Sequence, residues 1–296
     1  MKATRNELPA VFTISLRLFL CVLFAGLSGQ AMGVLVEEVI DVPVRLKSPK
    51  GQDIEQPIKV AVFRDDSREN APYLILNHGR AVDAAGRAKL KPSRYAGNAR
   101  YFVSKGFVVL IPTRIGYGDT GGPDVEDSGP CDDRKFAPVY AVAAEQTVAV
   151  LKAAEKLPYV DLTRGVVAGQ SFGGMTAITL STMRLPGMLG AINFAGGGGG
   201  NPTKRPGHPC SSDRLLKLYE DYGVASKVPT LWLYSENDRY WGPTLPGKWW
   251  EAFVAAGGKA RFTQLPASGE DGHNSFTANP DAWKPSFEKF IGELGF

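Results

Sequence analysis

The sequence GVVAGQSFGG, residues 165–174, places a serine between glycines directly after a short apolar run. The apolar run has the composition of a strand buried on both faces, and residues 175–183 have helix-like spacing. Gly169 and Gly173 stand two residues on either side of Ser171, where larger side chains would collide across a sharp turn. A strand, a tight turn and a helix in this order predict that Ser171 is presented at the tip of the turn in a strained backbone conformation.

Strand-like and helix-like segments alternate along most of the chain. Strands are predicted at residues 34–46, 58–63, 73–76, 107–111, 165–168, 189–194, 230–234 and 260–265. Helices are predicted at residues 95–104, 139–157, 175–183, 213–222, 248–256 and 282–291. Two opening strands followed by repeated strand and helix units favour the α/β class, with one mostly parallel sheet covered by helices on both faces. Because no linker or internal repeat interrupts the alternation, residues 32–296 are expected to form a single domain.

The composition argues against several classes of partner. The 296 residues include 34 Lys and Arg against 30 Asp and Glu, a formal net charge of +4. These charges are dispersed, so the sequence lacks the basic cluster that a nucleic acid requires, and no nucleic-acid partner is expected. The histidines His78, His208 and His273 are far apart, and no paired metal-binding motif occurs. We therefore expect no metal site.

The N-terminal segment has the organisation of a secretory signal. Basic residues up to Arg17 precede an uncharged apolar run at 18–27, and small and polar residues follow it up to Gly33. The run is too short to span a bilayer, and the alternative of a buried cytosolic helix would require a polar face that the run lacks. Residues 1–31 are thus predicted to be a signal peptide cleaved near Ala31. The mature protein is expected to be secreted or periplasmic, with no stable membrane insertion.

Removal of this segment leaves two cysteines, Cys131 and Cys210. An even pair in an exported chain favours a disulfide, and two free thiols are the alternative. The cysteines follow the predicted strands 107–111 and 189–194. In a parallel sheet the loops after both strands emerge at the same edge as Ser171, so a bridge between them is expected to brace the rim of the site.

A second glycine pattern raises the possibility of a dinucleotide site. Gly116, Gly118 and Gly121 form the string G-x-G-x-x-G directly after a predicted strand. In a nucleotide-binding fold the string must open a helix whose N-terminus holds the pyrophosphate. Here it continues through Asp124 as an acidic loop, which would repel phosphate. We therefore disfavour the nucleotide site and expect no cofactor.

The residues that a nucleophilic serine requires lie downstream in the expected order. Asp238 follows the predicted strand 230–234, and His273 follows the predicted strand 260–265. Both therefore lie at the carboxyl edge of the sheet, where the turn presents Ser171. His273 is predicted to accept the proton of Ser171, and Asp238 to orient the imidazole and stabilise its charged form.

Two backbone N–H groups are candidates for an oxyanion hole. The N–H of Phe172 follows the nucleophile and lies at the start of the predicted helix. The N–H of Arg80 lies in the loop after the strand 73–76, in the sequence NHGR. His78 in the same loop is expected to hold the loop by hydrogen bonds, since its position in the chain order does not fit the catalytic base.

Several residues are candidates for contact with the substrate. Trp241 follows Asp238 closely and is a candidate for lining an acyl or aromatic pocket, although a place in the core is the more common role of such a residue. Arg80 and Arg114 are candidates for binding a substrate carboxylate, with simple solvation as the alternative. The glycine run at residues 196–200 is expected to be a mobile surface loop, with a run that leaves room beside the site as the alternative.

The chain resembles the α/β-hydrolases, and within them the dienelactone-hydrolase-like and prolyl-oligopeptidase-related serine esterases. The resemblance extends from His78 through residues 112–118 to Ser171, Asp238 and His273. It implies a twisted eight-stranded sheet and cofactor-free hydrolysis through an acyl-enzyme. The chain departs from dienelactone hydrolases proper, which have a cysteine where this chain has Ser171, and this favours a serine esterase.

The same resemblance places the loop of Tyr117 at the rim of the active site, where we expect Tyr117 to contact substrate. The predicted function is hydrolysis of a small-molecule carboxylic ester. A serine exopeptidase of the prolyl-oligopeptidase type is one alternative, although such enzymes usually carry an added domain for which residues 32–296 leave little room. A catalytically silent binding protein with the hydrolase fold is another alternative, against which the complete set of serine, aspartate and histidine argues.

Overall fold

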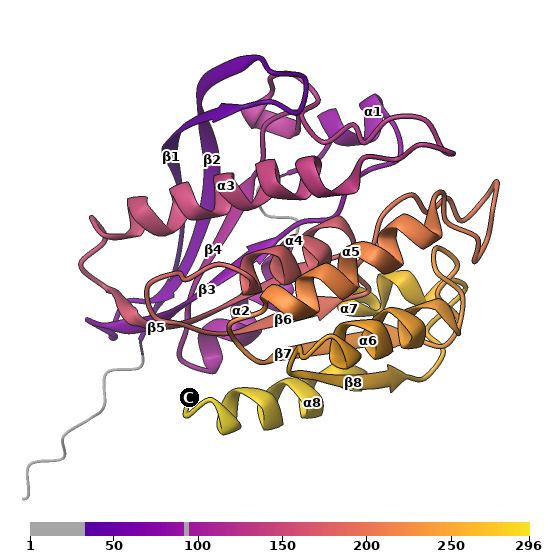
Figure 1. Ribbon diagram of the computed structural model, residues 1–296. Coiled ribbons are helices and arrows are strands. Elements are labelled where there is room, and N and C mark those ends of the chain that lie inside the picture. The colour runs from indigo at the N-terminus through magenta and orange to yellow at the C-terminus, as the bar shows by residue number, and fades with distance from the viewer. Residues whose placement is uncertain (1–32, 92–94) are drawn as a thin grey trace, which may run out of the picture. The chain divides into compact units, whose positions relative to one another are not determined.

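A computed structural model gives the structure of residues 33–91 and 95–296 (Figure 1). The predicted signal peptide, residues 1–31, lies outside the described residues. No helix in the described part of the chain is long and apolar enough to cross a membrane.

Eight strands in the described part of the chain form one sheet. They are β1 (Leu35–Lys47), β2 (Asp53–Asp65), β3 (Ala71–Asn77), β4 (Val108–Thr113), β5 (Val160–Gln170), β6 (Met188–Phe194), β7 (Thr230–Ser235) and β8 (Ala260–Leu265). Their order across the sheet is β1-β2-β4-β3-β5-β6-β7-β8. β2 is antiparallel to both β1 and β4, and the other neighbouring pairs are parallel. The mostly parallel sheet confirms the predicted α/β class.

Helices cover both faces of this sheet (Figure 1). They are α1 (Ala84–Ala88), α2 (Ala96–Ser104), α3 (Phe136–Ala154), α4 (Phe172–Ser181), α5 (Ser212–Ala225), α6 (Leu245–Ala255), α7 (Ser275–Ala278) and α8 (Pro280–Glu293). Two 3₁₀-helices, η1 (Gly118–Thr120) and η2 (Gly272–Asn274), lie in loops. α2 and α8 pack on one face, and α3, α4, α5 and α6 pack on the other.

The central strands are apolar at almost every position because helices bury both of their faces. In β3, Leu74 and Leu76 contact the cluster that contains α2 and α8, whereas Tyr73 and Ile75 contact the cluster that contains α3 and α4. Successive side chains of a strand point to opposite faces, so both layers depend on the same short run. This packing fixes the carboxyl ends of the parallel strands, from which the loops of the site extend.

Candidate active site

Ser171 lies between the last residue of β5 and the first residue of α4, with φ 57° and ψ −122°. A side chain rarely adopts this positive φ, so the turn stores strain. A Cβ atom at Gly169 would lie 2.0 Å from the carbonyl oxygen of Gly173, and one at Gly173 would lie 2.1 Å from the carbonyl oxygen of Asn77. Both glycines are therefore required for β5, the turn and α4 to pack this closely.

The structure brings Ser171, His273 and Asp238 into one hydrogen-bonded chain. His273 Nε2 lies 2.9 Å from Ser171 Oγ, and His273 Nδ1 lies 2.9 Å from Asp238 Oδ2. The second carboxylate oxygen of Asp238 accepts hydrogen bonds from the backbone N–H groups of Tyr240 at 2.8 Å and Trp241 at 3.1 Å. Because a carboxylate can only accept, Nδ1 carries the proton and Nε2 is left to accept the hydrogen of Ser171 Oγ.

Aromatic rings hold the imidazole in this position. The ring of Tyr240 stacks on His273 with centroids 3.9 Å apart, and Trp241 contacts His273 edge-on at 5.4 Å. Trp241 is itself fixed, since its Nε1 donates to the carbonyl oxygen of Ala195 at 2.8 Å. The sequence did not identify Tyr240, because its stacking depends on how the loop after β7 folds over η2.

Gln170, the residue before the serine, connects the three loops of the site. Its Nε2 donates to the carbonyl oxygen of His273 at 3.1 Å, and its Oε1 accepts from the hydroxyl of Tyr95 at 3.1 Å. The N–H of Gly79 in turn donates to the Tyr95 hydroxyl at 3.3 Å. Sequence analysis missed Gln170, which occupies the variable position of the Gly-x-Ser-x-Gly pattern.

The loop that contains Arg80 runs directly against the serine. A Cβ atom at Gly79 would lie 3.1 Å from Ser171 Cβ. Among the described residues, the backbone N–H groups of Arg80 and Phe172 have no hydrogen-bond partner, and both residues line the same cavity as Ser171. His78 accepts a hydrogen bond from the N–H of Arg114 at 3.1 Å through Nε2, and its Nδ1 lies 2.8 Å from the carbonyl oxygen of Gly79. His78 thus ties the loop to the end of β4.

Ser171 opens into a cavity of about 380 Å³. Its aromatic wall is formed by Phe136, Tyr140, Phe172, Tyr240 and Trp241. Trp241 is buried in the core and also lines this wall. The described residues contain no group of three or more His, Cys, Asp or Glu side chains placed to hold a metal ion.

The sequence predicts a mobile surface loop at the glycine run 196–200, and this prediction is wrong. Residues 196–198 are buried, and the run forms part of the cavity wall. The hydroxyls of Tyr219 and Tyr234 donate to the carbonyl oxygen of Gly196 at 3.0 and 2.7 Å, and Tyr140 donates to that of Gly197 at 2.9 Å. Three tyrosines from separate elements therefore hold the backbone in place.

Solved structures of known proteins share this architecture. A Klebsiella pneumoniae protein named as a dienelactone hydrolase has a TM-score of 0.55 and 16% identity, over 87% of this chain and 99% of its own. An acetyl xylan esterase from Paenibacillus sp. R4 has a TM-score of 0.58 and 14% identity, over 88% of this chain and 89% of its own. The chain has the α/β-hydrolase fold.

An acylaminoacyl peptidase from Pyrococcus horikoshii, with a TM-score of 0.56 and 16% identity, matches 87% of this chain but only 41% of its own length. No family model and no curated protein matches the sequence. At these identities the likeness concerns the α/β-hydrolase fold alone, so any reaction must be argued from the side chains of the site.

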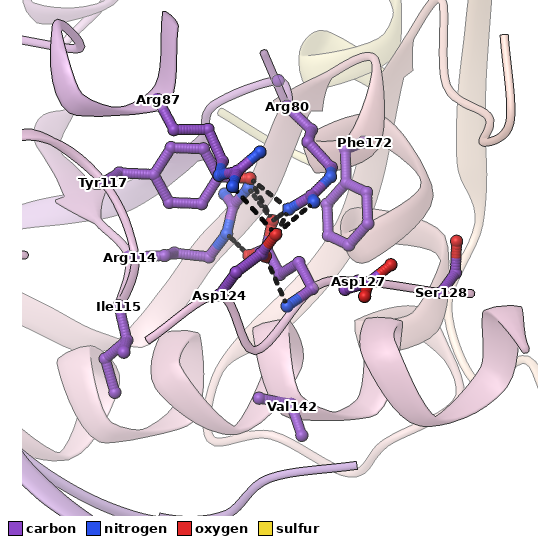
Figure 2. Close-up of polar contacts among 12 residues, drawn as sticks. Arg80, Arg87, Arg114, Ile115, Tyr117, Asp124, Asp127, Ser128, Val142 and Phe172 are labelled. Atoms are coloured by element: carbon purple, nitrogen blue, oxygen red, sulfur yellow. Dashed lines mark hydrogen bonds and ion pairs between the residues drawn. The ribbon is translucent and has the colours of Figure 1, made fainter. Parts of the chain in front are cut away.

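Beside the cavity, this α/β-hydrolase fold buries an ion pair that sequence analysis did not predict. Arg114 Nε donates to Glu126 Oε1 at 2.5 Å, and the Tyr117 hydroxyl donates to Glu126 Oε2 at 2.5 Å (Figure 2). Burial by itself would lower the pKa of Arg114, but the Glu126 carboxylate outweighs burial and raises it. Arg114 and Tyr117 are buried and do not line the cavity. Tyr117, which was expected to contact substrate, and Arg114, for which binding of a substrate carboxylate and simple solvation were the alternatives, both contact Glu126 instead.

Arg80 is held by a carboxylate of its own. Its two terminal nitrogens donate to the two oxygens of Asp124 at 2.7 and 2.6 Å, and Arg87 Nη2 lies 3.0 Å from the same carboxylate (Figure 2). Burial by itself would raise the pKa of Asp124, but the hydrogen bonds and charge of Arg80 outweigh burial and lower it. The bidentate pair positions the loop that carries the Arg80 N–H beside Ser171.

Replacement of Glu126 by Gln is expected to lower the free energy of unfolding by about 3 to 5 kcal/mol, because it leaves the charge of Arg114 buried without compensation. Urea denaturation would measure the change. The control is Asp281→Asn, which breaks the exposed pair with Lys284 and should cost less than about 1 kcal/mol. Equal, small losses in the two variants would contradict the importance of the buried pair.

Cys131 and Cys210 form a disulfide with Cα atoms 4.8 Å apart, and both line the cavity. Cys131 lies in the loop before α3, and Cys210 lies in the loop between β6 and α5. The bridge spans 79 residues of sequence. It joins two loops of the rim, as their positions after parallel strands had suggested.

Thiol titration of the denatured, unreduced protein is expected to find no thiol other than that of Cys21, where the N-terminal segment is still present. Loss of the bridge in a Cys131→Ser, Cys210→Ser variant should lower stability by up to about 4 kcal/mol, because the unfolded chain regains the entropy of a long loop. Urea denaturation of the variant beside the unreduced parent would measure this. Two further free thiols in the parent would refute the bridge.

Proposed function

We propose that the chain is a serine hydrolase that cleaves small-molecule carboxylic esters through an acyl-enzyme, with Ser171, His273 and Asp238 as catalytic residues. The observation that carries the proposal is the pair of 2.9 Å hydrogen bonds from Ser171 to His273 and from His273 to Asp238, at the end of a cavity lined by Ser171. The esterase among the structural neighbours supports the same reaction class.

In the first half of the proposed reaction, Ser171 Oγ attacks the ester carbonyl while its proton passes to His273 Nε2. The N–H groups of Phe172 and Arg80 stabilise the negative charge on the carbonyl oxygen. The intermediate then collapses, the bond to the alcohol oxygen breaks, and His273 returns the proton to the departing alcohol. In the second half, water gives a proton to His273 and attacks the acyl carbonyl. The bond between the acyl carbon and Ser171 Oγ then breaks, the acid is released, and His273 returns the proton to Ser171 Oγ.

We also propose that the mature protein is exported after removal of residues 1–31. The disulfide between Cys131 and Cys210 supports this, because disulfides persist in oxidising compartments such as the periplasm and the extracellular space.

The peptidase among the structural neighbours supports one alternative, in which the substrate is a peptide or another amide and not an ester. The decisive experiment compares p-nitrophenyl esters of graded acyl length with aminoacyl p-nitroanilides. Esters should be cleaved with much higher kcat/KM than any anilide. A preference for anilides would replace the esterase by a peptidase, and inactivity on both series, with no reaction of Ser171 toward a fluorophosphonate, would favour a binding protein.

Replacement of Gln170 by Leu is expected to lower kcat/KM for the best ester roughly 10-fold to 100-fold, mainly through kcat, because the backbone of His273 loses the donor that positions it. Steady-state kinetics with a melting curve would check the result. The matched control is Gln264→Leu, since Gln264 also donates to a backbone carbonyl, but to that of Tyr234 in β7 and not to that of His273. Equal kinetics in the two variants would contradict a positioning role for Gln170.

A further inference from the structure

Three cationic side chains line the same cavity as Ser171: Arg134, Lys204 and Arg205. Within the described residues, no carboxylate oxygen lies within 4.0 Å of a side-chain nitrogen of any of the three, which is the distance that defines an ion pair. Arg134 precedes α3, whereas Lys204 and Arg205 lie in the loop between β6 and α5. Side chains from two separate loops therefore bring uncompensated positive charge to one cavity.

Arg134 is the most constrained of the three. Its Nη1 donates to Ser128 Oγ at 3.1 Å, but its Nε is buried and has no hydrogen-bond partner among the described residues. An unpaired buried donor on a charged group costs free energy that an acceptor would recover. Burial lowers the pKa of Arg134, Asp127 opposes the change, and the positive charges of Arg80 and Arg205 contribute to it. The guanidinium groups thus repel one another across the cavity.

Arg205 is held in place without being neutralised. Its Nη2 contacts the sulfur atoms of both Cys131 and Cys210, at 2.9 Å in the case of Cys210. A disulfide sulfur is a weak acceptor and carries no charge. The bridge, together with the hydrogen bond of 3.2 Å from the Arg134 N–H to Ser211 Oγ, fixes the two cationic loops to each other.

The acidic residues of the cavity offset only part of this charge, because Asp127 is the strongest charged neighbour of Arg134 but is the only carboxylate of the described residues that acts on it. Glu126 and Asp127 line the cavity, but Glu126 is paired with the buried Arg114 and Asp127 lies 3.7 Å from Lys50 Nζ. The remaining cation of the wall, Arg80, is matched by Asp124. The excess positive charge therefore belongs to Arg134, Lys204 and Arg205.

We propose that the substrate is an ester that carries a negatively charged group, of which a carboxylate is the simplest, bound by Arg134 and Arg205 with Lys204 at the rim. The guanidinium fork matches a carboxylate, and an anion in the cavity would relieve the repulsion among the cations. The aromatic wall takes the apolar part of the molecule. This inference rests on the proposed esterase function and specifies its substrate.

The test uses two pairs of esters, in each of which a carboxylate in one member is replaced by its uncharged methyl ester in the other. Mono-4-nitrophenyl adipate and its methyl ester place the charge on the acyl side, and 4-carboxyphenyl acetate and its methyl ester place it on the alcohol side. With spontaneous hydrolysis subtracted, we expect the charged member of at least one pair to have a kcat/KM at least about tenfold higher. The preference should fall as sodium chloride is added, because salt screens exposed charges.

Arg134→Gln and Arg205→Gln are expected to bring the ratio of charged to neutral kcat/KM close to one. The control is Lys289→Gln on α8, which packs on the other face of the sheet and should leave the ratio unchanged. A merely structural role of the arginines would lower both members of a pair together and leave the ratio as in the parent.

The result that overturns the inference is Ser171-dependent turnover with no preference for the charged member of either pair, or a preference that survives both arginine substitutions. In either case the proposed esterase function would still stand. No turnover of any ester, together with no reaction of Ser171 with a fluorophosphonate, would overturn the esterase function and this inference with it.

Discussion

Replacement of Ser171 by Ala is expected to lower kcat/KM for the best ester by roughly 10³-fold to 10⁶-fold, because serine, histidine and aspartate act as a unit and only binding and the oxyanion hole remain. The fold should persist. Because Ala has a Cβ as Ser does, the backbone strain at the positive φ of residue 171 should be the same in the variant as in the parent. Steady-state kinetics beside a melting curve would measure both effects.

The control for this variant is Ser275→Ala. Ser275 is also buried and begins α7, close in sequence to His273, but its hydroxyl has no place in the proposed reaction. We expect its kcat/KM to stay within about tenfold of the parent. An active Ser171→Ala variant would remove the basis of the acyl-enzyme.

Replacement of Asp238 by Asn is expected to lower kcat by roughly 10⁴-fold, because it changes which ring nitrogen of His273 carries the proton. The amide oxygen can keep the hydrogen bonds from the N–H groups of Tyr240 and Trp241, which leaves the amide NH₂ facing His273 Nδ1. Because that NH₂ donates, Nδ1 must accept and the proton moves to Nε2. His273 can then no longer accept the proton of Ser171.

Asp271→Asn is the matched control for that experiment. Asp271 accepts the backbone N–H of His273 at 3.0 Å but does not contact the imidazole nitrogens, so its loss should lower kcat by less than about tenfold. If the two aspartate variants lose activity equally, the effect comes from the backbone of η2 and not from the tautomer.

The fold could be predicted from the sequence because its signals are local. The composition of the short apolar strands already indicates that they are buried, and Gly169 is required by its close approach to Gly173 within the same turn. The α/β alternation then places Asp238 and His273 at the same sheet edge as Ser171. α4 begins earlier than predicted, at Phe172, because the helix is buried on all sides and its glycines hide the helical pattern.

The surroundings of the site could not be predicted because they depend on partners distant in sequence. Residues 196–200 look like a flexible glycine run, and only the hydroxyls of three tyrosines from other elements show that they are fixed. Tyr117 and Arg114 were candidates for substrate contact because the sequence does not show that Glu126, in an acidic loop, packs against them. The predicted contacts were therefore wrong where a buried partner came from another segment.

The most direct test of the central claim is reaction of the protein with a fluorophosphonate followed by peptide mass spectrometry. The fluorophosphonate phosphonylates only a serine that an adjacent base activates, and fluoride is released. We expect one equivalent of label on Ser171 of the parent and strongly reduced labelling in Asp238→Asn. Absence of label on Ser171 of the folded parent, or label on a different serine, would contradict it.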